Sequence, residues 1–485
     1  MLFFNQVFFI YLSFIFSCVI AQDNFDSTWV DFKKDPALKN AAISFSLVDL
    51  KTDTLLKFDN DSSALTCAST VKLFTTATAI ELLGENYAPV TSLYHNGYIK
   101  DSTLIGDLII RGNADISMGS QYFNSEDSLY KFLIDWKNTL TRLGIKGMIG
   151  NVYADGLAFG YKGTPKGWGK SDVGNYYGAF HSGLSIYDNA LRLYFKVPKN
   201  GEKASITKVF PEIKSLTLNG TVYSANIGSD NSSIHGIPFS YDRRVSGTLP
   251  ANRDTFLVKG SLPDPEMEFL NELVRVWNIS GFTINGSVLS ARSFKDTVFH
   301  YDKLKHVLSF TGKTVKDIAY WTNMKSLNVY AETLLAWIGF EKSGSGLTEN
   351  SAQLMEDYWK ERVYSKGLTL KDGSGLSRSN KVSAATFCSL LKYMNTSKNR
   401  SVFKNTLPVA GTSGTLKSFC KGQCSEGKFI AKSGTMNSVK SYAGYITTIE
   451  GRELTFALIV TNYSCSNSAI VKKMEPVMNA IYQLK

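Results

Sequence analysis

The chain has 485 residues, of which 44% are hydrophobic and 20% are charged. This globular balance excludes extensive disorder, collagen and coiled coil, and the length predicts roughly three domains. The 53 Lys and Arg residues exceed the 42 Asp and Glu residues, and the net charge of +11 favours anionic partners without choosing among nucleic acid, membrane and acidic cell-wall polymer.

The amino-terminal segment predicts export. Residues 1–21 carry no charged side chain, are mostly Phe, Ile, Leu and Val, and offer small-residue positions for signal cleavage at Val19-Ile20-Ala21. Cys18 leaves a lipid anchor open, and about 20 apolar residues could also stay as an uncleaved membrane anchor. We therefore expect an exported protein, periplasmic or associated with the cell envelope, and leave open a peripheral association with membrane or wall.

Two local patterns follow the signal. Residues 42–49 and 55–58 predict a pair of strands. Residues 70–83 are rich in Thr, Ala and Leu and stop at Gly84, which predicts a helix with an apolar face. Ser69 lies near the N-terminus of this helix.

The middle of the chain differs from its two ends. Residues 88–290 are Gly-rich and strand-like, whereas residues 326–340 have a helical pattern. Two alternating runs at 440–449 and 454–461 predict strands, and an apolar helix begins at Ser468. This order predicts a split domain interrupted by a β-rich insertion.

Five cysteines remain besides Cys18, an odd number. Cys420 and Cys424 close a short loop, and we predict a disulfide between them. No His lies near that pair, which disfavours a metal site, and we expect no cofactor.

The first candidate for chemistry is Ser69-Thr70-Val71-Lys72. Residues three apart share one face of a helix, so the Ser hydroxyl and the Lys amine can meet. A lysine whose pKa is lowered by desolvation can take the hydroxyl proton and activate the nucleophile. Ser-x-x-Lys occurs seven times in the chain, but Ser69 alone opens a long apolar helix directly after a strand pair.

The second candidate is Ser326-Leu327-Asn328, which leads into the helix predicted at 329–338. A short loop that precedes a buried helix can hold polar groups over a nucleophile. Ser229-Asp230-Asn231 has a similar pattern, but it lies in a polar Gly/Asn/Ser stretch that predicts an exposed loop.

The third candidate is Lys432-Ser433-Gly434-Thr435, which continues the strand pattern of residues 428–431. A lysine on an edge strand beside the nucleophile would attract a carboxylate and would help to lower the pKa of Lys72. Gly434 would let a substrate backbone approach, and the N–H groups of Ser69 and Thr435 could form an oxyanion hole. The similar Lys342-Ser343-Gly344 lies in a Gly/Ser loop.

The ordered trio resembles the motifs of the penicillin-binding D-Ala-D-Ala carboxypeptidases of the peptidase S13 family, the class C low-molecular-mass penicillin-binding proteins. Ser326 follows Ser69 by 257 positions, much further than in β-lactamases, and the family fills this gap with two nested accessory domains. Other segments are also similar to the family's, at 106–115, 176–179, 182–185, 188–189, 372–378 and 409–416.

The resemblance implies a role for each motif residue. Ser69 would be the acylated nucleophile and Lys72 its general base. Ser326 would relay a proton toward the leaving amine, Asn328 would bind the substrate amide, and Lys432 would hold the terminal carboxylate.

Further substrate contacts are implied as well. Ser433, Gly434 and Thr435 would bind substrate, and Ser433 stands where the family usually has Thr while keeping the hydroxyl. Asp155 matches an Asp of the inserted domain that meets the diamino acid of the stem peptide.

The implied fold is the α/β (α+β) serine β-lactamase/DD-peptidase-like fold, an antiparallel sheet flanked by helices. Residues 1–21 would be the signal, and residues 22–90 and 290–485 the two parts of the catalytic domain. Residues 91–289 would be an inserted accessory domain II with a nested domain III near 193–257.

We therefore expect a serine-type D-Ala-D-Ala carboxypeptidase, a DD-endopeptidase or both, acting on peptidoglycan stem peptides and acylated by penicillin and other β-lactams at Ser69. Nucleic acid is not expected as a partner, because the chain has no basic run. Two alternatives stay open. The long insertion disfavours a β-lactamase or esterase on the same frame, and the intact trio disfavours a non-catalytic wall-binding or sensor protein.

Overall fold

The computed structural model describes residues 25–294 and 299–485. The predicted signal at 1–21 and the predicted anchor site at Cys18 lie outside the described residues. Within the described ranges, no helix has the length and apolar character needed to cross a membrane.

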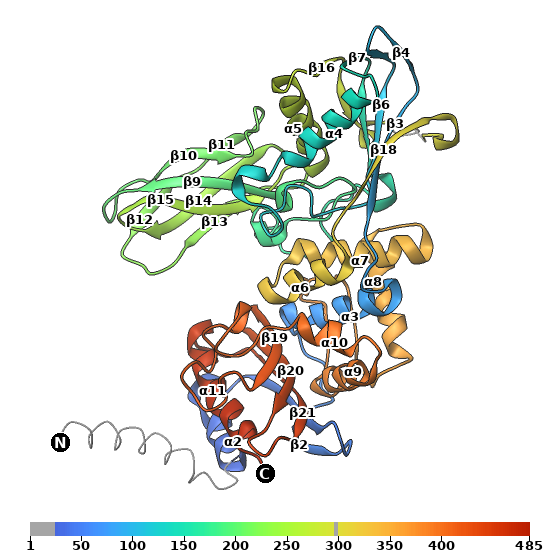
Figure 1. The fold of residues 1–485 in the computed structure, drawn as a ribbon. Coiled ribbons are helices and arrows are strands. Elements are labelled where there is room, and N and C mark those ends of the chain that lie inside the picture. The colour runs from blue at the N-terminus through green and yellow to red at the C-terminus, as the bar shows by residue number, and fades with distance from the viewer. Residues whose placement is uncertain (1–24, 295–298) are drawn as a thin grey trace, which may run out of the picture.

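A five-stranded antiparallel sheet is formed by residues from both ends of the chain (Figure 1). Its strands lie in the order β19-β20-β21-β1-β2, so the C-terminal strands pair directly with the first N-terminal ones. The strands are β1 (Ala42–Asp49), β2 (Leu55–Asp59), β19 (Phe429–Met436), β20 (Val439–Thr447) and β21 (Glu453–Thr461).

Both faces of this sheet are covered, which explains why β21 is buried at every position after Glu453 and has an unbroken apolar run from Phe456 to Val460. Phe456 and Leu458 pack on one face with helices α2 (Phe25–Lys34) and α11 (Asn467–Tyr482), and the intervening Ala457 faces the opposite core. Strands buried on two sides lose the usual alternation of apolar and polar residues.

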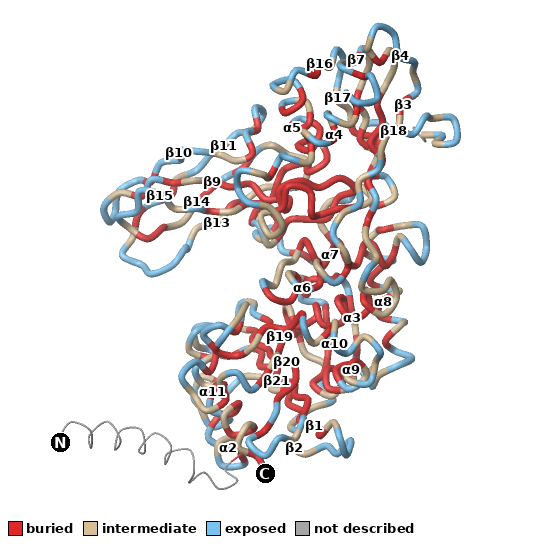
Figure 2. Tube along the Cα trace, viewed as in Figure 1, coloured by how far each residue is buried: buried red, intermediate tan, exposed pale blue. Residues whose placement is uncertain are grey.

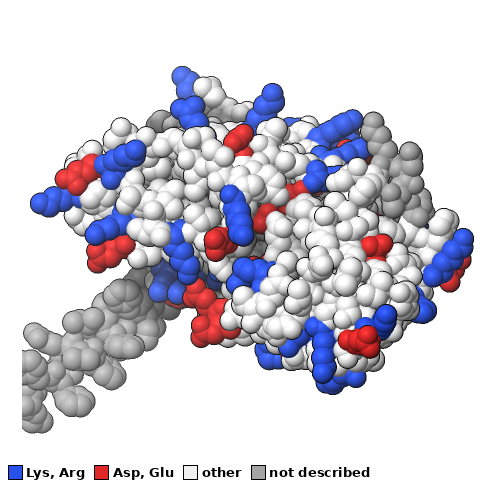
Figure 3. Space-filling view, turned by 90° about the horizontal axis from the view of Figure 1, so that it is seen from above, with Lys and Arg blue, Asp and Glu red and all other residues white. Residues whose placement is uncertain are grey.

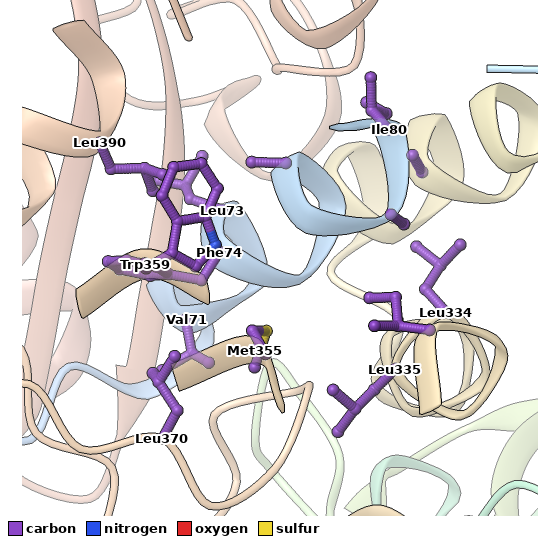
Figure 4. Close-up of a cluster of buried hydrophobic side chains, with 14 of the residues drawn as sticks. Val71, Leu73, Phe74, Ile80, Leu334, Leu335, Met355, Trp359, Leu370 and Leu390 are labelled. Carbon is purple, nitrogen blue, oxygen red and sulfur yellow. The ribbon is translucent and has the colours of Figure 1, made fainter. Parts of the chain in front are cut away.

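The second face packs against a group of helices (Figures 1 and 4). Helix α3 is buried at every position from Lys72 to Ile80, as expected for a central helix with neighbours all round. Phe74, Leu335 and Trp359 belong to the core that surrounds it. The helices of this group are α3 (Lys72–Leu83), α6 (Val315–Lys325), α7 (Asn328–Ser343), α8 (Thr348–Lys360), α9 (Ala384–Thr396) and α10 (Arg400–Asn405).

The segment between α3 and α6 contains the remaining described strands, β3 to β18, in four further sheets, together with helices α4 (Lys131–Arg142) and α5 (Pro265–Ile279). It has its own apolar core. One sheet has the order β17-β8-β6-β3-β18 and another β16-β7-β5-β4. Their strands are β3 (Val90–His95), β4 (Tyr98–Lys100), β5 (Thr103–Ile105), β6 (Leu108–Arg111), β7 (Gly147–Ile149), β8 (Val152–Asp155), β16 (Thr283–Asn285), β17 (Val288–Ser290) and β18 (Lys305–Thr311).

The other two sheets extend away from the helices, and their far ends are largely exposed (Figure 2). One has the order β10-β9-β15, and in the other β14 pairs with β11, β12 and β13. Their strands are β9 (Ala190–Val197), β10 (Ser205–Phe210), β11 (Thr217–Asn219), β12 (Val222–Ala225), β13 (Asn231–His235), β14 (Asp242–Pro250) and β15 (Arg253–Ser261).

The strand pairing bears on how the chain divides. Because β18 pairs with β3, residues 305–311 belong to a sheet of the inserted region. The division into 22–90, 91–289 with a nested part near 193–257, and 290–485 stays a proposal, and this pairing favours placing the return to the catalytic part after Thr311.

The predicted disulfide between Cys420 and Cys424 is wrong, because no disulfide joins these residues. Cys420 has a left-handed backbone (φ 57°) and is buried in the core under the sheet. The half-buried Cys424 sulfur instead accepts a hydrogen bond from Gln483 at 3.7 Å. Burial raises the pKa of the Cys420 thiol to about 12, which makes it unreactive.

The net positive charge is dispersed on the face that Figure 3 shows. Lys and Arg side chains there are interspersed with Asp and Glu, without a continuous basic tract. Binding to a nucleic-acid backbone needs clustered Lys and Arg, and this face does not provide them.

Candidate active site

Ser69 lies where the first strand pair ends and the central helix begins. It belongs to a short 3-10 turn, η2 (Ala68–Val71), that runs directly into α3. Ala68 has a left-handed backbone (φ 50°), which turns the chain sharply and leaves Ser69 only half-buried between buried neighbours. The predicted helix is confirmed, with its first turn tightened.

Lys72 is completely buried beside this serine. Its Nζ lies 2.9 Å from Ser69 Oγ, 2.6 Å from Asn328 Oδ1 and 2.6 Å from the carbonyl oxygen of Ser374. Burial lowers the pKa of Lys72 to about 7, although the carboxylates of Asp372 and Glu332 oppose the shift. A neutral Nζ would donate its two hydrogens to the Asn328 and Ser374 oxygens and keep its lone pair for the Ser69 hydroxyl.

A buried loop holds the Ser374 carbonyl in place. Asp372 accepts hydrogen bonds from the N–H groups of Gly375 (2.7 Å) and Ser377 (2.6 Å), and Glu332 of α7 accepts from the Ser374 N–H at 2.8 Å. Burial, followed by the charge of Asp372, raises the pKa of Glu332. The segment 372–378, which sequence reasoning gave no role, therefore positions Lys72.

Ser326 and Asn328 lie at the junction of α6 and α7. Ser326 ends α6 in a left-handed conformation (φ 59°), and Asn328 is the first residue of α7. The Asn328 side chain bridges two regions, since its Oδ1 accepts from Lys72 and its Nδ2 donates to the Tyr177 carbonyl at 2.7 Å. The loop before a buried helix is as predicted, and the helix itself begins at Asn328.

Lys432 lies on β19, which is an edge strand as predicted. Its Nζ donates to Ser326 Oγ at 2.9 Å and to the Ser433 carbonyl at 2.7 Å. Burial and the nearby charges of Lys72 and Lys440 lower the pKa of Lys432 well below its usual value. The structure thus brings the three motifs together, although they are separated by more than 100 residues along the chain.

Gly434 is required by the protein's own packing. A Cβ at this position would lie 2.3 Å from Ser441 Oγ, 2.4 Å from the Cys67 carbonyl oxygen and 3.1 Å from the Ser69 nitrogen. We predicted a glycine here so that a substrate backbone could approach, whereas the packing shows close approach of the protein's own backbone and the Ser441 side chain. The glycine lets β19 lie directly against the turn that carries Ser69.

A cavity of about 860 Å³ opens above these residues. Ser69, Ser326, Asn328, Ser433 and Thr435 line it, whereas Lys72 and Lys432 are buried beneath its surface. The hydroxyl of Ser433 donates to Thr415 Oγ1 at 2.9 Å, so several hydroxyl groups lie together at the β19 wall.

Sequence reasoning assigned no role to four charged residues that line this cavity, Asp172, Lys325, Arg378 and Lys440. Lys440 donates to Thr435 Oγ1 at 2.8 Å, and burial lowers its pKa to about 8. Asp172 and Arg378 line the side near Tyr177, and burial raises the pKa of Asp172 while Arg378 partly offsets this. The sequence could have indicated Lys440, because a tight hairpin after the Lys432–Thr435 motif places it opposite Thr435.

Asp155, the predicted site residue of the inserted region, does not line the cavity. It ends β8, where its carboxylate accepts hydrogen bonds from the Tyr301 hydroxyl at 2.5 Å and from the Leu157 N–H at 3.1 Å. These contacts make it a fixed turn residue of the inserted region. Asp172 is the carboxylate that faces the cavity instead.

A serine with a buried lysine as its hydrogen-bond partner, at the junction of a sheet and a helical group, is the arrangement of a serine-type acyl-transfer hydrolase. The D-Ala-D-Ala carboxypeptidase 3 (S13) family matches residues 29–483, and the chain belongs to this family.

Curated relatives match over nearly the whole chain. A D-alanyl-D-alanine carboxypeptidase of Actinomadura sp. is 26% identical over 448 residues, which cover 89% of this chain and 80% of that one. The D-alanyl-D-alanine carboxypeptidase DacB of Haemophilus influenzae is 24% identical over 446 residues, which cover 90% and 88%. The predicted family is confirmed.

A solved structure supports the fold. Penicillin binding protein 4 of Haemophilus influenzae has a TM-score of 0.79 at 22% identity, covering 94% of this chain and 99% of that one. A second structure of that protein, complexed with a β-lactam, has a TM-score of 0.74 at 20% identity. The predicted mixed α/β fold class is confirmed.

Proposed function

We propose that this protein hydrolyses the terminal D-Ala-D-Ala bond of peptidoglycan stem peptides, the bond that cross-links two such peptides, or both. The reaction would proceed through an acyl-enzyme on Ser69. The observation that carries the proposal is the 2.9 Å contact between Ser69 Oγ and a buried Lys72 whose pKa is lowered to about 7. A lysine with such a pKa is present as a free base in a large fraction of molecules near neutral pH.

In the proposed acylation step, Lys72 takes the Ser69 proton as Oγ attacks the carbonyl carbon. The C–N bond then breaks, and the leaving amine takes a proton through the Ser326 hydroxyl, which is held by Lys432 at 2.9 Å. The N–H groups of Ser69 and Thr435 stabilise the oxyanion. Water, activated by Lys72, hydrolyses the ester and restores Ser69.

The β19 wall is suited to the terminal carboxylate of the substrate. Lys432 lies beneath it, the hydroxyls of Ser433 and Thr435 face the cavity, and Lys440 supports the Thr435 hydroxyl from the next strand. A carboxylate bound at this wall would favour the protonated form of Lys432, and hydrogen bonds between charged groups are stronger than those between neutral ones.

We propose that Asp172 and Arg378 take the role that sequence reasoning gave to Asp155. A carboxylate and a guanidinium on one wall of the cavity fit a side chain that ends in both an amine and a carboxylate, as a diamino acid does. The relatives named as carboxypeptidases and the β-lactam complex of the structural neighbour support the same substrate class. Export of the chain and its place in the cell envelope stay part of this proposal.

Labelling with a fluorescent penicillin tests the nucleophile. We expect one covalent label per chain, lost in Ser69→Ala and kept in Ser418→Ala, which alters another Ser-x-x-Lys sequence. Equal labelling of the Ser69 variant would overturn the proposal.

Mass spectrometry of muropeptides tests the reaction. We expect loss of one D-Ala from pentapeptides, conversion of cross-linked dimers to monomers, or both. Rapid turnover of penicillin with unchanged muropeptides would show a β-lactamase on this frame instead.

A further inference from the structure

A second chamber of about 550 Å³ adjoins the candidate cavity. The two share Tyr176, Tyr177, Lys325, Ser326 and Asn328 as lining residues, so they meet at the start of α7. On its other sides the chamber is lined by strand β15 at Leu257–Lys259 and by a turn at Asp188. Its far wall therefore belongs to the inserted region.

The turn at Asp188 has an unusual backbone. Tyr187, Asp188 and Asn189 are all left-handed, with φ values of 54°, 61° and 50°. Left-handed backbone is unfavourable for residues other than glycine, and clusters of this kind persist only where the surrounding structure holds them in place. The Asp188 carboxylate accepts hydrogen bonds from the Tyr330 hydroxyl at 2.8 Å and from Gln121 Nε2 at 3.0 Å, and these contacts hold the turn in place.

The chamber also presents two cations. Lys259 on β15 donates to Gln121 Oε1 at 3.2 Å. Lys325, the last residue of α6, is exposed and makes no ion pair with any residue in 25–294 or 299–485. Two carboxylates also line the chamber, Asp188 and Asp230. Asp188 accepts three hydrogen bonds, and Asp230 accepts two from Ser232, so the two lysines are the charged groups left to bind a ligand that carries carboxylates.

The shared wall indicates which part of a substrate the chamber would receive. Ser326 is the group proposed to protonate the leaving amine, and it lies on the boundary between the two cavities. Cavities of about 300–1,000 Å³ hold ligands of drug size. A chamber of about 550 Å³ is larger than a single departing alanine needs.

We propose that this chamber binds the second peptide of a cross-linked substrate, the one whose amine departs when the cross-link is cut. This inference rests on the proposed function and assigns a binding site to the departing peptide of that reaction. In that step the Ser69 Oγ–C bond forms, the cross-link C–N bond breaks, and the departing amine gains the proton relayed by Ser326. The carboxylates of the departing peptide pair with Lys259 and Lys325.

Filling the chamber tests the inference. Leu257 lines the chamber but not the first cavity, and it is 37% exposed, so Leu257→Trp blocks the chamber without entering the site at Ser69. We expect kcat/KM for cross-linked dimers to fall roughly tenfold, because binding energy from remote parts of the substrate is lost. Labelling by penicillin and D-Ala release from monomeric pentapeptides should stay within about twofold of wild type.

A matched control is Ile237→Trp, since Ile237 is 64% exposed in the same inserted region and lines neither cavity. Lys259→Gln provides a smaller change in case the tryptophan disturbs folding, and Lys208→Gln on the exposed strand β10 is its control. Of these two lysine variants, we expect Lys259→Gln to raise KM for dimers and Lys208→Gln to leave it unchanged.

The outcomes separate the two proposals. Unchanged dimer cleavage in Leu257→Trp and Lys259→Gln, equal losses on dimers and monomers, or no dimer cleavage by the wild type would overturn the chamber's role. Unchanged dimer cleavage in the two variants, or no dimer cleavage by the wild type, would still be compatible with carboxypeptidase activity at Ser69. Absence of both labelling and peptide cleavage in the wild type would overturn the proposed function itself.

Discussion

At the scale of single residues, burial is the main cause of the lowered pKa of Lys72. The side chain sits on the central helix with no exposed surface, and the cost of a buried ammonium lowers its pKa to about 7 despite two nearby carboxylates. The same burial gives Nζ three polar partners at hydrogen-bond distance, so the neutral amine is also oriented.

This pKa predicts the acid limb of the pH profile. Below pH 7 Lys72 becomes protonated and cannot accept the Ser69 proton, so the rate of acylation should fall about tenfold per pH unit. Stopped-flow measurement of penicillin acylation between pH 5 and pH 9 would show this limb. A rate that stays flat down to pH 5 would contradict a neutral Lys72 as the base.

Lys440 predicts the alkaline limb. Its pKa of about 8 means that it loses its charge above that pH, which should raise KM for substrates with a terminal carboxylate. Lys440→Met should raise KM roughly tenfold at neutral pH with little change in kcat, equivalent to about 1.4 kcal/mol of binding. Lys440→Arg is the matched control, and it should extend the plateau above pH 8 because arginine stays charged.

At the scale of elements, the site depends on how closely β19 approaches the turn η2. That approach is possible because Gly434 has no side chain where the Cys67 carbonyl and the Ser441 hydroxyl lie. A similar contact occurs at Gly375, where a Cβ would lie 2.0 Å from the Ala68 carbonyl oxygen. Because these two glycines have no side chain, the strand and the 372–378 loop can pack directly against the turn that carries Ser69.

Gly434→Ala should separate β19 from the Ser69 turn. We expect acylation by penicillin to slow by about 100-fold, since small displacements of reacting groups are costly, while the protein stays folded. Gly228→Ala in an exposed loop with no atom within 4 Å is the control. Labelling rates and circular dichroism would be measured together, and an unchanged rate in the Gly434 variant would refute this role.

At the scale of the whole molecule, the inserted region is joined to the site by specific hydrogen bonds. Trp168 Nε1 donates to Asp372 at 2.8 Å, Tyr177 accepts from Asn328, and Trp337 donates to the Asn113 carbonyl at 3.1 Å. Because Asp372 orders the loop whose Ser374 carbonyl contacts Lys72, the insertion contributes to the geometry of the site.

Trp168→Phe removes the hydrogen bond to Asp372. We expect a loss of about 1 kcal/mol in the free energy of unfolding and a slower acylation, because the carboxylate loses one donor. Trp29→Phe removes a similar bond to Asp59 (3.1 Å) far from the site, and should lower stability without slowing acylation. Thermal unfolding and labelling rates would distinguish the two variants, and equal acylation in both would show that the link is only structural.

Much of the site was predictable because its motifs are local. Ser69 and Lys72 are one helical turn apart, Ser326 and Asn328 flank the start of a helix, and Lys432 lies in a strand pattern. Short-range spacing and apolar periodicity fix such features without reference to the rest of the chain. Asp155 shows the limit of this reasoning, since an aspartate at the end of a strand looks the same whether it faces a cavity or a tyrosine.

The sequence by itself determined the Ser-x-x-Lys helix, the terminal sheet strands and the order of the three motifs, because each depends on neighbours within a few residues. Only the tertiary structure decided that Lys72 is buried, that Asp172 and Lys440 line the cavity, and that Cys420 and Cys424 are not bonded to each other. Burial and pairing between distant segments set pKa values and cavity walls, and they arise from packing across hundreds of residues.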